Sequence, residues 1–193
     1  MQITRGALLA RGLGAAFTLA FAGAFTPSAG AALGDEDLAW ARVAVAWDLL
    51  LIAFYRRALS SRRLPPAPAR LLREALADEG EHYHAAARML TAAGSTPAVA
   101  ADFEYAFPGG SFASADRIAA LGLRLESACL RSHLGATQAV ADAGLRFTMA
   151  QAATAAAAHA GLLAALAPGA LPGAFPVPLD LAGASAAQAP YLG

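Results

Sequence analysis

The sequence is poor in residues that many common functions require. It has a single cysteine and no lysine, and its 14 basic residues are balanced by 14 acidic ones. One cysteine cannot form an intrachain disulfide, so the fold must be stabilised by its packed core. The zero formal charge, without arginines interleaved with aromatic residues, argues against nucleic-acid binding.

Several sequence patterns are missing as well. The chain has no alternating strand pattern, no glycine-rich phosphate loop, no internal repeat, and no serine or cysteine beside a histidine–acid pair. These absences argue against a β fold, a phosphate-binding loop and nucleophilic hydrolysis. What remains is an alanine-rich chain of 193 residues, 58% of them hydrophobic, which predicts one closely packed helical domain.

Four long helices are expected, which makes the fold class all-α. Acids at positions 35–37 suit the start of a helix, the prolines at 65–68 suit the start of the second, and Ser114 suits the N-cap of the third. The expected ranges are about 35–60, 69–93, 114–139 and 142–166. The aromatic-rich stretch 96–114 predicts a long crossover between the second and third helices. The proline-rich tail is expected to be extended and pinned to the bundle by Phe175, Leu179, Leu181 and Tyr191.

The N-terminus has the order of segments of a signal peptide. Arg5 and Arg11 precede the apolar stretch 13–25, and Ala29-Gly-Ala31 suits a small-x-small cleavage site. We therefore predict a signal peptide at 1–31, a helical bundle at 32–167 and a packed tail at 168–193, with export to the periplasm or the extracellular space. After cleavage no stable membrane span is expected. The alternative is an uncleaved membrane anchor.

Two acids stand inside long apolar helical runs and point to a polar centre in the core. Asp48 lies between Val43 and Tyr55, and Glu126 lies between Ile118 and Leu130. Carboxylates are rarely buried unless they are paired or bound to a metal. Neither acid has a basic residue on its own helical face within one turn.

The second and fourth helices add imidazoles to these acids. Glu79 and His82 are three residues apart, so both can reach the same ion, and His159 stands in an almost pure alanine helix. Glu81 and His84 repeat the spacing but point to another face, and we expect them to be solvated. Cys129 is interpreted as a small core residue, with a metal-binding or redox thiol as the alternative. Together, Asp48, Glu79, His82, Glu126 and His159 predict a metal centre inside the bundle.

In these stretches the sequence resembles the ferritin-like family that includes plant desiccation-related proteins and exported bacterial homologues. The matching stretches are 48–55, 78–82, 102–107, 125–126 with 134–136, His159, and the ending 179–191. The resemblance implies a ferritin-like four-helix bundle and metal ligands at the five residues named above. It also implies a role in metal handling or in protection against oxidative or desiccation stress.

Two positions depart from the family pattern. Asp48 stands where the family has Glu, and Ala156 stands where a second Glu-x-x-His would begin. By position, one ion would keep Asp48, Glu79 and His82, and the other would keep Glu126 and His159 with Glu79 as the bridge. The second site is weakened because a carboxylate is missing.

These departures leave the function open at this stage. The mixed oxygen and imidazole ligands suit one or two ions of Fe, Mn or Zn. The alternative is a metal-free ferritin-like scaffold that acts as a binding or structural stress protein. Whether the chain is an enzyme stays open. The alanine-rich fourth helix also allows a homodimer.

Overall fold

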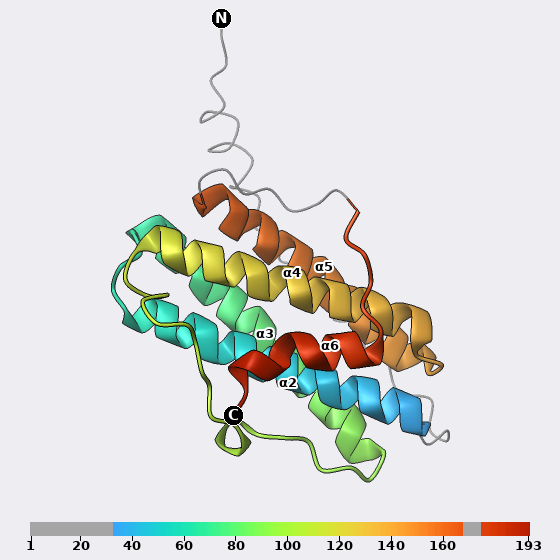
Figure 1. Cartoon of the computed structure of the whole chain (residues 1–193). Helices are drawn as coiled ribbons and strands as arrows, with labels where there is room; N and C mark the ends of the chain where they lie inside the picture. Colours follow the sequence, from blue (N-terminus) through green and yellow to red (C-terminus); the bar gives the residue numbers. More distant parts are fainter. Residues whose placement is uncertain (1–32, 168–174) are drawn as a thin grey trace, which may run out of the picture.

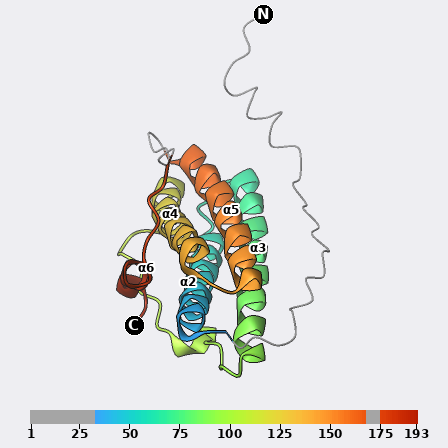
Figure 2. The same ribbon diagram turned by 90° about the vertical axis from the view of Figure 1, so that its right-hand side faces the viewer.

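The computed structural model describes residues 33–167 and 175–193 and is all-helical over these ranges, as predicted (Figure 1). The predicted signal peptide and residues 168–174 of the tail lie outside the described residues. The five α-helices are α2 (Asp35–Ser60), α3 (Pro66–Ala92), α4 (Ala115–Ala139), α5 (Ala143–Leu166) and α6 (Leu181–Gln188). Two short 3-10 helices, η1 (Ala100–Asp102) and η2 (Ala189–Tyr191), complete the described secondary structure. Helices α2 to α5 form the bundle, and α6 lies outside it against α2 and α4 (Figure 2).

Helix α2 forms the centre of the core. Asp35, Glu36 and Asp37 in its first turn complement the positive end of the helix dipole, and large apolar side chains such as Trp47 and Phe54 are fully buried. By length and composition α2 and α5 could each cross a membrane, but 72% of the apolar window of α2 is buried inside the bundle. The apolar character of α2 therefore serves the core that surrounds the polar centre.

The helix boundaries follow local capping chemistry. The Ser114 hydroxyl accepts a hydrogen bond from the Arg117 amide at the start of α4, and the Asp142 carboxylate accepts one from the Leu145 amide at the start of α5. Helix α3 begins at Pro66, three residues before the predicted start at 69. The first turn of a helix needs no backbone donor and suits the fixed φ of proline, so the prolines lie inside this helix rather than before it.

Helices α2 and α4 run antiparallel, and two contacts fix their register. The buried carboxylate of Asp37, at the start of α2, accepts hydrogen bonds from the amides of Ala141 and Asp142 just after α4. Near the other end of α2, the hydroxyl of Tyr55 donates to Oε1 of Glu126. The start of α2 therefore lies beside the end of α4, and the end of α2 lies beside the first half of α4.

The segment between α3 and α4 contacts α2 at two places, one in the first half of α2 and one near its end. Arg42 in the first half of α2 donates to the Ser95 hydroxyl, and the Arg57 guanidinium near the end of α2 lies over the Phe112 ring. In the middle, the backbone of residues 104–106 pairs with that of residues 191–193 at the C-terminus. This segment therefore joins the C-terminus to the bundle.

The described part of the tail, residues 175–193, is here called the C-terminal strap, and it corrects two predictions. Its residues Leu181–Gln188 form α6 rather than an extended chain, because alanine favours helix and the Asp180 carboxylate caps the Gly183 amide. Phe175 was expected to pin the tail but is 93% exposed. Leu179, Leu181 and Tyr191 do pack against the two core clusters.

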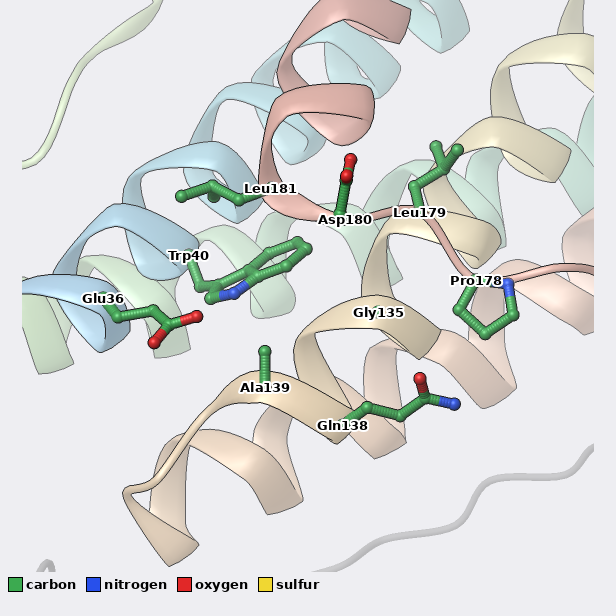
Figure 3. A pocket seen from close by; sticks show the side chains of 9 residues that line it. All are labelled: Glu36, Trp40, Gly135, Gln138, Ala139, Pro178, Leu179, Asp180 and Leu181. Carbon is green, nitrogen blue, oxygen red and sulfur yellow. The ribbon is translucent and has the colours of Figure 1, made fainter.

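The strap is anchored on α4 at Gly135. The Leu179 amide donates to the Arg131 carbonyl, and the Arg131 guanidinium donates to the Val177 carbonyl. A Cβ added at Gly135 would lie 1.7 Å from the Leu179 carbonyl oxygen, so only glycine permits this approach. A groove of about 400 Å³ lies beside this contact, between Trp40 and the strap (Figure 3). None of the predicted metal ligands lines this groove.

Candidate metal centre

Three of the predicted ligands come together between α2 and α3. Asp48 of α2 and Glu79 of α3 are buried, and His82 lies one turn after Glu79 with its side chain partly exposed. One ligand atom from each lies within 4.8 Å of the others. We call Asp48, Glu79 and His82 the Asp48 half-site.

The remaining predicted ligands form a second group that shares one residue with the first. Glu126 of α4 and His159 of α5 are buried beside Glu79, and one ligand atom from each of the three also lies within 4.8 Å of the others. We call Glu79, Glu126 and His159 the His159 half-site. The structure thus brings all five predicted residues together in two groups that share Glu79.

His159 is surrounded by carboxyl oxygens on both sides of its ring. Its Nδ1 lies 3.1 Å from Oε1 of Glu79 and 3.3 Å from Oε1 of Glu126. Its Nε2 lies 3.2 Å from Oδ2 of Asp78, a residue whose side chain is half exposed. An ionised carboxylate can only accept hydrogen bonds, so both ring nitrogens must carry a proton to satisfy these contacts. His159 is therefore an imidazolium, a built-in cation of the centre.

The electrostatics of Glu79 and His159 reflect this ion pair. Burial alone raises the pKa of Glu79, but hydrogen bonds from His159 and His82 outweigh burial and lower this pKa to about 2. Burial alone lowers the pKa of His159, but its three carboxyl partners outweigh burial and raise this pKa to about 12. Glu79 is therefore a carboxylate, and His159 is a cation, over the whole neutral range.

Glu126 and Asp48 are less well compensated than Glu79. Burial and the charge of Glu79 raise the pKa of Glu126 to about 7, against the opposing contacts with His159 and Tyr55. Burial, together with the charges of Glu79 and Glu126, raises the pKa of Asp48 well above its ordinary value. Within the described chain, Oδ1 of Asp48 and Oε2 of Glu126 are buried and have no hydrogen-bond partner. Such orphaned carboxylate oxygens are costly unless a cation satisfies them.

Four other positions discussed in the sequence analysis lie outside the two half-sites or add no ligand to them. Glu81 and His84 are exposed on the outer face of α3. Cys129 is a free, buried cysteine in the main core cluster, and burial raises the pKa of its thiol well above the usual value, so it packs as an inert core residue. Ala156 is buried three residues before His159, so α5 offers no carboxylate beside its imidazole.

The two half-sites differ in how well they fit a metal ion. The Asp48 half-site offers two carboxylates and an imidazole, and Asp48 has an orphaned oxygen that an ion would satisfy. In the His159 half-site, both ring nitrogens of His159 already bind carboxyl oxygens as a cation. The donor set therefore fits one transition-metal ion on the Asp48 side, while a proton supplies the positive charge on the other.

Three residues near the centre were not among the predicted ligands. Tyr55 donates to Glu126, Asp78 binds His159, and His133 of α4 is buried with 2% exposure. Tyr55 and His133 could have been found by spacing, because each lies seven residues, or two helical turns, after a predicted buried acid on its own helix. Asp78 could not, because its contact with α5 is set by tertiary packing.

Comparison with known proteins adds one finding. A family model described as a ferritin-like domain matches residues 36–168, which covers nearly all of the four-helix bundle and every residue of both half-sites. No curated protein matches the chain in sequence.

Proposed function

We propose, because the chain belongs to the ferritin-like domain family, that its bundle binds one divalent transition-metal ion in the Asp48 half-site and serves in metal handling or stress protection. The observation that supports a single ion is the position of His159 between three carboxyl groups. This imidazolium balances part of the buried negative charge, so there is charge for one further divalent cation and not for two.

Each residue of the chain has a distinct part in this proposal. Asp48 and Glu79 supply oxygen ligands, and His82 supplies a nitrogen ligand at the partly exposed side of the centre. Tyr55 orients Glu126 by its hydrogen bond, and Glu126 in turn helps to hold the ring of His159. A redox-active ion bound there would supply electron transfer to oxygen or peroxide, and a redox-inert ion would be held in store.

A pair of matched double variants tests the proposal. Glu79→Gln with His82→Ala removes two of the three ligands, whereas Glu81→Gln with His84→Ala makes the same changes at the same spacing on the exposed face of α3. After expression with iron, manganese and zinc available, we expect about one metal ion per chain in the wild type and in the exposed-face variant, and none in the first. Equal metal content in the two variants, or no metal in the wild type, would refute the proposal.

A metal-free scaffold is the second candidate function. The observation that favours it is that the ion pairs of His159 satisfy Glu79 and partly satisfy Glu126 without any metal. It predicts that the thermal unfolding temperature is the same with and without a chelator, whereas a metal-bound bundle loses stability when its ion is removed. A fall in unfolding temperature on chelation that is reversed by added metal would exclude this candidate.

Export is part of the proposal and rests on residues 1–31, which lie outside the described residues. The basic, apolar and small segments of this stretch support cleavage after Ala31. Mass spectrometry of the mature N-terminus in the producing cell is the test. A chain that keeps residues 1–31 and sediments with membranes would instead support an uncleaved anchor.

A further inference from the structure

Positive charge is concentrated where α2 is joined to α3. Residues 49–73 include no acid, yet six of the chain's 14 basic residues lie there, all of them arginines that are exposed. They lie on the last two turns of α2, on the connecting turn and on the second turn of α3, so they gather at one end of the bundle (Figure 1). We call them the arginine patch: Arg56, Arg57, Arg62, Arg63, Arg70 and Arg73.

The guanidinium groups of the arginine patch do not tie the fold together. Elsewhere in the bundle, Arg42, Arg131 and Arg146 donate side-chain hydrogen bonds that join separate segments. Within the described part of the chain, no guanidinium of the patch makes a hydrogen bond or an ion pair, and that of Arg57 lies over the Phe112 ring. Like charges without acids between them repel one another, so interactions inside the chain do not account for the patch.

Helix dipoles account for only part of the patch. Arg57 in the last turn of α2 suits the negative end of that helix. Arg70 and Arg73 instead lie toward the positive end of α3, which has no acid in its first turn and no side-chain hydrogen bond from its N-cap residue, Pro65. Each of the other four described α-helices has an acid in its first turn or at its N-cap. The positive end of α3 therefore adds to the charge of the patch.

The turn presents its arginines in a fixed backbone geometry. The Ser61 hydroxyl donates to the Ala58 carbonyl at 2.6 Å and accepts a hydrogen bond from the Arg63 amide at 3.3 Å. Arg62 has a left-handed φ of 56°, which is uncommon for a residue other than glycine. Leu64 is partly buried against the core, and none of the exposed large hydrophobic residues of the described chain lies in this stretch. The surface therefore offers charge without an apolar side chain to insert.

We propose that the arginine patch is a docking surface for the anionic headgroups of a phospholipid bilayer. A guanidinium binds phosphate oxygens through two parallel N–H donors, and each arginine near an anionic bilayer strengthens binding about fivefold. Contact through charge alone is peripheral and is weakened by salt. A nucleic acid carries phosphates too, but single strands are held by stacking on aromatic rings, and the Phe112 ring at the patch lies beneath Arg57. The bilayer is therefore the favoured partner.

Two double variants with the same change in charge test this proposal. Arg63→Gln with Arg70→Gln removes two charges from the patch. Arg88→Gln with Arg124→Gln, the control, removes two exposed arginines outside it that also make no hydrogen bond or ion pair in the described chain. Protein purified from the producing cell is sedimented with vesicles of phosphatidylcholine and phosphatidylglycerol at about 0.1 M salt. We expect the patch variant to bind about 30-fold more weakly than the wild type, and the control to bind within about threefold of it.

Further measurements separate the bilayer from other anions. Wild-type binding should be weak on vesicles of phosphatidylcholine alone and should fall as salt is raised to about 0.5 M. Excess inorganic phosphate at constant ionic strength should not displace the vesicles, and a double-stranded oligonucleotide should bind more weakly than they do. Equal losses in the two double variants, equal binding to neutral and anionic vesicles, displacement by phosphate, or tighter binding to the oligonucleotide would each overturn the proposal. Circular dichroism and unfolding temperatures close to those of the wild type establish that both variants are folded.

Discussion

Replacing His159 by Gln separates two roles that this residue could have, a counter-ion or a metal ligand. The substitution removes the positive charge from the neighbourhood of Glu79 and Glu126, both of which are buried, but keeps a side chain that donates a hydrogen bond. Removing one partner of a buried ion pair costs about 3–5 kcal/mol, because the remaining charge is left uncompensated. A bundle of this size has a free energy of unfolding of about 5–15 kcal/mol, so the loss is large.

The assay is urea denaturation of metal-free protein at pH 8 and at pH 5. We expect the loss in the free energy of unfolding of His159→Gln to be larger at pH 8, because Glu126, with a pKa of about 7 in the presence of the imidazolium, takes up a proton at pH 5. The double variant His159→Gln with Glu126→Gln should recover part of the loss, because it removes a carboxylate that lost its partner. His84→Ala is the control and should unfold as the wild type does.

Added metal decides between the two roles. If His159 is a counter-ion, removing it leaves two carboxylates free for a cation, and Zn²⁺ or Mn²⁺ should stabilise His159→Gln more than it stabilises the wild type. If His159 is a ligand, the variant should instead lose the stabilisation by metal. That second result, or an unfolding midpoint of the metal-free variant equal to that of the wild type at pH 8, would refute the counter-ion role.

Three further predictions concern single features of the fold and the centre. Asp48→Asn should abolish metal binding yet raise the free energy of unfolding of the metal-free protein at pH 8, because it removes a buried carboxyl group whose pKa is raised by burial and by the charges of Glu79 and Glu126; chelator competition and urea denaturation measure the two effects. Gly135→Ala should destabilise the bundle by about 1–3 kcal/mol and expose the C-terminal strap to proteases, because the new Cβ would overlap the Leu179 carbonyl; wild-type resistance to limited proteolysis would contradict this. Glu79 has a lowered pKa of about 2, so its stabilisation is present above its unfolded pKa of about 4.3 and is lost as the pH falls toward 2; urea denaturation between pH 5 and pH 2.5 should show a shallower loss for Glu79→Gln.

The position of the centre could be predicted because burying an acid is costly, so an acid inside a long apolar helical run indicates a buried polar site. Asp48 and Glu126 stand out from apolar runs, and the Glu79–His82 spacing places both groups on one helical face. The four long helices could be predicted as well, since the capping residues and the apolar periodicity agree along the chain. The family resemblance added the expected order of these elements, which the ferritin-like match now supports.

What could not be predicted depends on contacts between distant segments. The ion pair of His159 with Asp78 joins residues 81 positions apart, and no local pattern links them. The helix in the C-terminal strap was missed because prolines on both sides of Leu181–Gln188 outweighed its alanine content in the interpretation. Exposure of Phe175 was missed because an aromatic side chain in an apolar tail is usually an anchor, and here the strap is held by backbone contacts at Leu179 instead.

The missing carboxylate at Ala156 and the cation at His159 belong to one electrostatic balance. A ferritin-like centre with four carboxylates can neutralise two divalent ions. Here three carboxylates are buried at the two half-sites, and a second divalent ion would leave an excess positive charge in a medium of low dielectric constant. One imidazolium and one divalent ion balance the three carboxylates, and a proton costs less space than a second metal with its ligands. The absence of an acid at Ala156 of α5 is therefore compatible with a metal centre, because a proton on His159 supplies positive charge that a second metal ion would otherwise have to supply.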